Sequence, residues 1–448
     1  MKKTWRWPLA GFVLGGLVGA TFLTVNVVGA SSPKPAGVAV SSFGEILHTP
    51  PLLAKAGEPV ELRYDVVCGQ PKDEPGGTCS PKGSVFVRAS GASDFVEQPL
   101  GREPDGLFSA EIPAGDGGFD YYAEIDNGRG ETATLPEAAA EAPEHVWPLR
   151  SWTTVDLGPE RFGETSPPSS VVSELTWGKG SQALGLGSGH EQSRIGPSAF
   201  DVAPDGAIVV LDQVNHRLST LRPGQTPAQA PIDFAGGEGD LAIGGDGTIY
   251  VLDAGASQPV VRSFSPAGDL IAGTPLAEAT ADMVRVGPDG PLVHAYPSEM
   301  WLPTGRGRPP LAPDQQLAGA QAARSVTGGL AVVVSASPAE ARFALVRGGD
   351  VVHSWLVRSS TSLGEVQLAE PYGDGLLVVV RLWDENQAEF RVLQLVPGGL
   401  AGSFAVDRAE WAETASLSRF RLHGTTLYQL RSVPSGVEIA AFEIGGTR

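Results

Sequence analysis

The chain has 448 residues, of which 42% are hydrophobic, and a formal net charge of −19. This hydrophobic content can build a sizeable core and excludes disorder over most of the length. The acidic balance repels nucleic acid and anionic membranes, so we expect no nucleic-acid partner. With 58 glycines, 37 prolines and 7% aromatic residues, the composition favours short strands joined by turns over helices.

The N-terminus has the pattern of an export signal. A basic start precedes an apolar stretch over residues 9–25, and the small residues that follow suit cleavage after Ala30. The alternative is an uncleaved membrane anchor, because the stretch approaches the length of a membrane-spanning helix. In both cases we expect residues 1–30 to direct export to a secreted, periplasmic or cell-envelope location, with residues 31–42 as a flexible spacer.

Residues 43–136 are predicted to form a first β domain, because their strand candidates alternate apolar with polar residues. The segments 106–113 (GLFSAEIP) and 119–126 (FDYYAEID) resemble bacterial immunoglobulin-like or fibronectin type III modules. This resemblance implies an N-terminal immunoglobulin-like β-sandwich. The cysteines depart from the immunoglobulin framework, since Cys68 and Cys79 are too close in sequence to be its inter-sheet pair.

Cys68 and Cys79 are the only two cysteines of the chain. An exported protein meets an oxidising environment, so we expect these two residues to form a disulfide. A metal or redox role would need further ligands or a Cys-x-x-Cys spacing, which the sequence lacks.

A repeat follows the acidic, alanine-rich segment 137–145, which is predicted to be a linker. From residue 146 to residue 448, a two-residue turn, most clearly Asp-Gly, is followed again and again by a short apolar strand. The second turn residue stands at 206, 247, 290, 329, 375 and 424, so the copies are 39 to 49 residues apart. This is the length of a β-propeller blade, and four antiparallel strands per copy leave no room for a helix.

The first copy, residues 196–218 (GPSAFDVAPDGAIVVLDQVNHRL), resembles an NHL repeat down to its Asp-x-x-Asn-His-Arg run. The resemblance implies an all-β, six-bladed NHL-like propeller. A seventh blade made from residues 150–195 is the alternative. The last copy has no room for a fourth strand, and residues 171–177 or 152–157 could supply it and close the ring.

Acidic residues recur beside the strands of the first two copies. A ring of such carboxylates could hold a divalent cation such as calcium near a central channel. More commonly, an Asp at a strand end accepts backbone hydrogen bonds in its own corner. We therefore expect a structural role for the residues of the repeat signature, which are Asp201, Asp212, Asn215, His216, Arg217, Asp240 and Asp253.

Three histidines on different copies, His216, His294 and His423, are weak candidates for metal ligands, because propeller lyases use histidines that converge on the channel. No His-x-His or His-Glu-x-x-His spacing supports such a site. The glycine-rich segment 178–189 lacks the Gly-Lys-Ser/Thr order of a phosphate loop and is predicted to be a plain loop. Tryptophans at 301, 355, 383 and 411 would suit carbohydrate or peptide binding if exposed.

The sequence therefore predicts an exported, non-enzymatic binding or scaffold protein without a cofactor. A face of its propeller would bind a protein, a peptide or a glycan. The alternative is an extracytoplasmic lyase or hydrolase with a divalent cation in the central channel. No nucleophile elbow or other catalytic motif favours this alternative.

Overall fold

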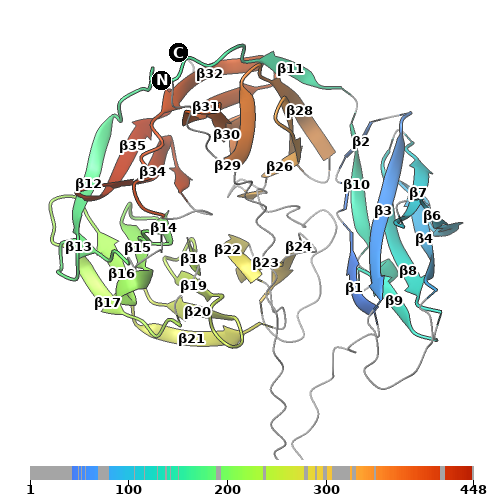
Figure 1. Ribbon diagram of the computed structural model, residues 1–448, viewed down its shortest axis with the longest axis horizontal. Helices are drawn as coiled ribbons and strands as arrows, with labels where there is room; N and C mark the ends of the chain where they lie inside the picture. The colour runs from blue at the N-terminus through green and yellow to red at the C-terminus, as the bar shows by residue number, and fades with distance from the viewer. Residues whose placement is uncertain are drawn as a thin grey trace, which may run out of the picture. The chain divides into compact units, whose positions relative to one another are not determined.

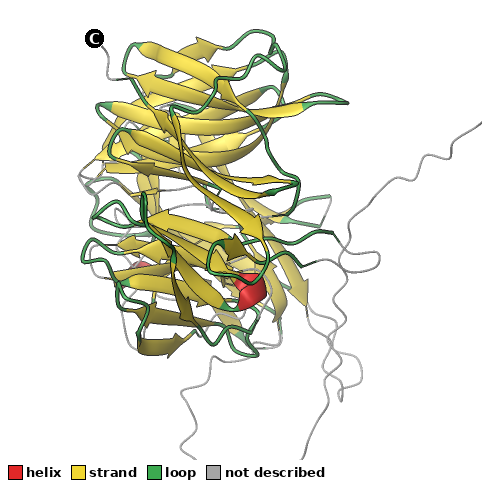
Figure 2. Cartoon of the chain, turned by 90° about the vertical axis from the view of Figure 1, so that its left-hand side faces the viewer, coloured by secondary structure: helices red, strands yellow, loops and turns green. Residues whose placement is uncertain are grey.

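The computed structural model describes residues 43–445, apart from residues 49, 52, 56, 69–79, 105, 116, 129, 137–138, 142, 150, 188–192, 236–238, 277–280, 288–289, 296–299, 305–322, 325–328, 348–349 and 414–418. Strands dominate this part of the chain, and its only helical segments are the 3₁₀ turns η1 (Ala139–Glu141) and η2 (Gln213–Asn215) (Figure 2). No helix within it is long and apolar enough to cross a membrane. The predicted all-β class is confirmed, whereas the predicted signal and spacer lie outside the described residues.

Two sheets at the N-terminal end share one apolar core. The first has the strand order β1-β3-β7-β6, and the second has the order β2-β10-β8-β4-β5 with β9 also paired to β8. Their bounds are β1 (Phe43–Leu47), β2 (Leu53–Lys55), β3 (Pro59–Cys68), β4 (Lys82–Ala89), β5 (Val96–Pro99), β6 (Gly101–Arg102), β7 (Phe108–Pro113), β8 (Phe119–Asp126), β9 (Thr132–Leu135) and β10 (Glu144–Leu149).

Alternation along the strands explains this core. In β8, Phe119, Tyr121, Ala123 and Ile125 are buried while the residues between them are more exposed. Side chains alternate between the two faces of a strand, so these four point to one side and pack with residues of β3 and β7 from the other sheet. The strand candidates of the first β domain therefore correspond to real strands.

The predicted boundary at residues 137–145 differs from the strand pairing. Strand β10 pairs antiparallel with β8 and parallel with β2, so Val146 belongs to the second N-terminal sheet and not to the repeat region. The reason is burial, because Val146, Trp147 and Leu149 are each at most 3% exposed. The predicted linker overlaps this strand at Glu144 and His145, because the prediction weighed the acidic composition and not the buried residues that follow.

The described residues after β10 form six further sheets. In sheet order, three of them are β14 (Ala199–Val202), β15 (Ile208–Asp212), β16 (Arg217–Leu221) and β17 (Ala228–Pro231); β18 (Gly239–Ile243), β19 (Ile249–Asp253), β20 (Val260–Phe264) and β21 (Leu270–Pro275); and β22 (Ala281–Gly287), β23 (Gly290–Ala295) and β24 (Met300–Pro303).

The other three sheets, in the same order, are β25 (Ala323–Arg324), β26 (Gly329–Ala336), β27 (Glu340–Arg347), β28 (Asp350–Arg358) and β11 (Thr153–Asp156); β29 (Ser362–Tyr372), β30 (Gly375–Trp383), β31 (Ala388–Val396) and β32 (Gly399–Val406); and β33 (Phe420–His423), β34 (Thr426–Val433), β35 (Gly436–Glu443), β12 (Ser170–Trp177) and β13 (Ala183–Leu184).

These sheets stand around a common centre (Figure 1). The inner strands β14, β18 and β22 contact one another in sequence, and β29 contacts β33, which in turn contacts β14. Neighbouring sheets share apolar cores, as where Phe200 of one sheet packs with Leu430 and Ile439 of another. A ring of antiparallel sheets packed face to face is a β-propeller. The propeller fold predicted from the repeat spacing is confirmed.

The turn residues that marked the repeat stand at equivalent places in these sheets. Each of the six markers lies at the start of a second strand or at most two residues before it. Gly206 and Gly247 have φ angles of 81° and 83°, a backbone conformation that favours glycine. The turn therefore sets where each inner strand ends and its partner begins.

An N-terminal segment closes the ring. Strand β12 pairs antiparallel with β35, the last described strand, so of the two candidate segments it is residues 171–177, and not 152–157, that complete the last copy. Strand β11 pairs parallel with β28 of a different sheet. The connecting segment, residues 157–169, runs between these strands and contacts the intervening sheet, where the backbone N–H of Ser166 donates to the carbonyl of Ala405 at 2.8 Å.

Candidate functional site

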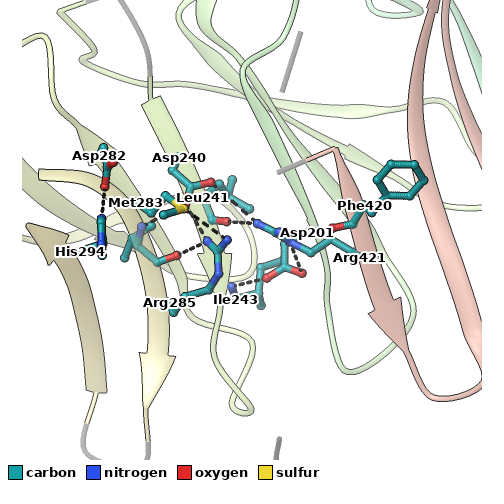
Figure 3. A network of polar contacts seen from close by, with 11 residues as sticks. Asp201, Asp240, Leu241, Ile243, Asp282, Met283, Arg285, His294, Phe420 and Arg421 are labelled. Carbon is teal, nitrogen blue, oxygen red and sulfur yellow. Dashed lines mark hydrogen bonds and ion pairs between the residues drawn. The ribbon is translucent and has the colours of Figure 1, made fainter. Parts of the chain in front are cut away.

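A network of charged side chains lies on the inner strands of the propeller (Figure 3). Asp201 belongs to β14, Asp240 to β18, Arg285 to β22 and Arg421 to β33. Strand pairing places Asp201 opposite Val209 and Asp240 opposite Leu252, so the two aspartates stand two positions apart in the repeat. A spacing of two keeps both on the same face of their strands.

Two arginines compensate these carboxylates. The Arg421 guanidinium lies 3.4 Å from Asp201 and 3.7 Å from Asp240, and it donates to the carbonyl of Leu241 at 3.2 Å. Arg285 donates to Asp240 at 2.7 Å. Arg421 therefore joins its own strand β33 to both β14 and β18, and Arg285 joins β22 to β18.

The same carboxylates also accept backbone hydrogen bonds across the ring. Asp201 accepts from the N–H of Val202 and, on its other oxygen, from Ile243 in the next sheet, each at 2.8 Å. Asp240 accepts from Val284, again one sheet further on, at 3.0 Å. Each aspartate thus ties its inner strand to the next one, which is a structural role of the kind predicted for turn and strand-end aspartates.

Burial raises several carboxyl pKa values in this network. The pKa of Asp201 is raised by burial, which outweighs the opposing effect of Arg421. Burial also raises the pKa of Glu370, on the inner strand β29, to about 7, with Arg421 and Arg285 opposing and Asp201 adding to the rise. The pKa of Arg421 is lowered by burial and by Arg285. Each buried charge of the network would be costly without a partner, and the opposite charges of the network offset this cost.

The candidate histidines do not come together. His294 is fully buried on β23 and shares a 2.6 Å hydrogen bond with Asp282 (Figure 3). His216 is exposed at the left-handed end of η2, with φ of 51°, and its Nδ1 lies 2.8 Å from the Phe234 carbonyl oxygen. His423 ends β33 at a hairpin. Among the residues that the structure describes, no group of three or more His, Cys, Asp or Glu is placed to hold a metal ion.

The signature residues of the first repeat hold the glycine-rich loop. Asp212 is fully buried and accepts from Gly185 N–H at 2.9 Å and from Arg217 at 2.8 Å. Arg217 donates to the carbonyls of Ala183 at 2.6 Å and Lys179 at 3.0 Å, and Asn215 donates to that of Gly178 at 2.9 Å.

The described part of the glycine-rich segment, up to Gly187, has no helix, but the prediction of a plain loop is wrong at Ala183 and Leu184, which form strand β13 beside β12. In the second repeat, an equivalent buried aspartate is also paired with an arginine. Asp253 is fully buried, at the position of β19 that corresponds to Asp212 in β15. It accepts from Arg262 at 2.7 Å and from the N–H of Ala235 at 3.0 Å. The second repeat lacks the Asn-His-Arg run, but Arg262, the third residue of β20, pairs with Asp253 as Arg217, the first residue of β16, pairs with Asp212. The predicted disulfide cannot be compared in this way, because Cys79 lies outside the described residues.

A polar pocket of about 440 Å³ lies where β29 meets the segment before β33. Its lining combines charged side chains with one tryptophan, and the residues are Ser193, Arg194, Glu365, Gln367, Arg408, Glu410, Trp411, Ala412, Glu413 and Arg419. Trp411 was one of the scattered tryptophans of the sequence. Of the others, Trp355 is fully buried and Trp383 is 42% exposed.

Sequence reasoning missed the basic members of both sites. Arg285 and Arg421 lie in short apolar strands, where a single arginine gives no periodic signal. The alternation around Arg421, between Phe420 and Leu422, does place it on the face opposite to these apolar neighbours. The pocket arginines come from two segments without a motif: Arg194 precedes β14, and Arg408 and Arg419 lie between β32 and β33. Only the fold brings these segments together.

Comparisons with known proteins add no family. No protein-family model matches the chain, and a search of curated proteins found no match. Solved structures that are similar include the PQQ-bound aldose sugar dehydrogenase from Streptomyces coelicolor, which is 14% identical, with 62% of this chain and 99% of that chain covered and a TM-score of 0.34. A streptogramin B lyase is 10% identical, with 80% and 97% covered and a TM-score of 0.30. The Dos1 propeller is 9% identical, with 63% and 95% covered and a TM-score of 0.30. Similarities this weak say nothing about function, and the propeller assignment rests on the strand pairing.

Proposed function

We propose that the protein is an exported, non-enzymatic binding protein in which an immunoglobulin-like β-sandwich precedes a six-bladed NHL-type propeller. The six sheets of the ring, counted over the described residues, would be the six blades. The resemblance of residues 196–218 supports the NHL type, and the predicted leader supports export. A face of the propeller would bind a protein, peptide or glycan.

The pocket beside β29 is the observation that carries this proposal. It collects charged and aromatic side chains around a volume large enough for part of a ligand. The channel carboxylates offer less, because both oxygens of Asp201 already accept hydrogen bonds and Asp240 contacts Arg285 and Arg421. A carboxylate engaged in this way is poorly placed to hold a cation or to move a proton.

The test combines a metal measurement with a binding screen on the purified protein. We expect no stoichiometric divalent cation, and binding to members of a peptide and glycan array that is lost in Arg408→Gln. Arg347→Gln is the matched control, because Arg347 belongs to β27 and is not part of the pocket. A stoichiometric cation whose removal leaves the fold intact but abolishes a lyase or hydrolase activity would contradict the proposal.

A further inference from the structure

We propose that the pocket between β29 and β33 binds the free carboxylate of a short peptide. This inference rests on the proposed binding function and names the ligand class of the same site. Its basis is the arrangement of the arginines and the acidic residues that line the pocket together.

One carboxylate of the pocket lining pairs with two arginines, of which one is buried and the other is exposed. Arg419 is 6% exposed and its Nη2 lies 3.0 Å from Oε1 of Glu410. The other oxygen of Glu410 is paired with Arg408. Because one carboxylate, Glu410, serves two guanidinium groups, these three side chains together carry one more positive than negative charge.

Outside the pocket lining, Arg381 adds a positive charge near Arg419, and Glu365 of the lining adds a negative one. Arg381 on β30 stands opposite the irregular stretch of β29 that carries Glu365, since the strand register shifts between Leu363 and Val366. Burial, together with the nearby charges of Arg408 and Arg381, lowers the pKa of Arg419 to about 10, while Glu365 opposes this shift. A guanidinium with a pKa of about 10 is still charged at neutral pH. A ligand carboxylate would relieve the repulsion and could accept two hydrogen bonds from one guanidinium.

The net charge of the whole molecule limits how many negative charges a ligand can carry. At a formal net charge of −19, the protein repels polyanions at long range. A single carboxylate on a ligand that is otherwise neutral or zwitterionic avoids most of this repulsion. The exposed Glu365 and Glu413 also line the pocket and suit the ammonium or N–H groups of the same ligand. A short peptide carries both kinds of group.

The tryptophan of the pocket favours a peptide over a sugar. The guanidinium of Arg194 lies over the Trp411 ring at 4.5 Å, and the Trp177 ring centre is 5.9 Å from that of Trp411. Sugar rings bind proteins by stacking on an open aromatic face. Here the ring is already engaged within the protein, and displacing Arg194 would cost a cation–π contact.

The experiment uses a set of tripeptides, each made once with a free C-terminal carboxylate and once as the C-terminal amide. Isothermal titration calorimetry on the purified protein should detect binding of carboxylate forms, with the amides weaker by about tenfold or more. Arg408→Gln should weaken the carboxylate forms to the level of the amides. Arg347→Gln should leave both unchanged, and a thermal unfolding curve checks that each variant is folded.

Arg419 is buried, so its replacement could disturb folding, and the exposed Arg408 carries the test for that reason. Equal affinity of carboxylate and amide forms, or no binding of any tripeptide, would overturn the inference. A uronic acid disaccharide serves as the third probe. If it binds and the tripeptides do not, the peptide inference fails while the binding function stands, whereas a metal-dependent activity would sink the proposed function itself.

Discussion

At the scale of single residues, this protein keeps its buried charges in pairs and small networks. Asp212 with Arg217, Asp253 with Arg262 and Asp240 with Arg285 all join different segments of chain. A buried ion pair adds little net stability compared with apolar residues, but an unpaired buried charge is costly. The arrangement therefore specifies which strands meet. Removal of one partner of a pair is expected to lower the stability of the fold strongly.

Replacement of Arg421 by Met is expected to destabilise the protein by about 3–5 kcal/mol. The methionine would leave Asp201 and Asp240 without this guanidinium, and Glu370 would lose an opposite charge nearby. Urea unfolding measures the change. Arg347→Met serves as the control, because Arg347 is partly exposed at 36% and should shift stability by no more than about 0.5 kcal/mol. Equal stability of both variants would show that the network is dispensable.

Glu370 predicts a pH dependence of stability. Its pKa is about 7 in the folded protein against an ordinary value of 4.5, so the folded state retains a proton that the unfolded state has released. The associated stability is fully present below pH 4.5 and is lost as the pH rises through 7. At about 1.4 kcal/mol per pKa unit, the loss amounts to roughly 3–3.5 kcal/mol.

The measurement compares unfolding free energies at several pH values for the wild type and Glu370→Gln. Glu144 has a pKa of about 7 as well, raised by burial, and it produces a loss of the same sign in the wild type. The variant should therefore lose less stability than the wild type over this range but not none. Parallel curves for the two proteins would contradict the assignment to Glu370.

At the scale of elements, closure of the ring depends on close backbone contact between β12 and β35. A Cβ atom on Gly436 would collide with the carbonyl of Leu175, and one on Gly375 would collide in the same way with Leu395. Both glycines begin a strand that follows a tight hairpin turn. Gly375, which is one of the repeat's turn residues, and Gly436, which is not, thus both allow close strand packing.

Gly436→Ala should destabilise the protein by about 1–3 kcal/mol, because the added methyl group forces β12 away from β35. Gly402→Ala is the matched control in β32, where a Cβ meets nothing within 4 Å. Chemical unfolding compares the two variants with the wild type. A loss of stability in Gly402→Ala as large as in Gly436→Ala would attribute the effect to glycine replacement in general and not to the closure.

At the scale of the whole molecule, the excess of negative charge destabilises the folded state. A formal net charge of −19 repels itself more strongly when the chain is folded than when it is extended. The arginines of the inner strands stand out against this background, and Arg285 and Arg421 come from segments more than 100 residues apart.

Salt should therefore stabilise the protein. Raising NaCl from about 20 mM to about 300 mM shortens the Debye length to below 10 Å and screens the repulsion between surface carboxylates. The buried pairs are screened much less. Thermal unfolding at both concentrations should give a higher midpoint at the higher salt. A lower midpoint would mean that surface ion pairs outweigh the self-repulsion.

The local pattern of the sequence determined the all-β class and the repeated turn and strand, and it reduced the strand that completes the last sheet to two candidate segments. These follow from glycine turns, alternation and repeat length, which act over a few residues or at a fixed period. Tertiary structure alone decided that β10 belongs to the N-terminal sheet, that β11 pairs with β28, and that Arg285 and Arg421 meet the repeat's aspartates. Such contacts depend on which strands the ring brings together, and that information is not present in any single segment.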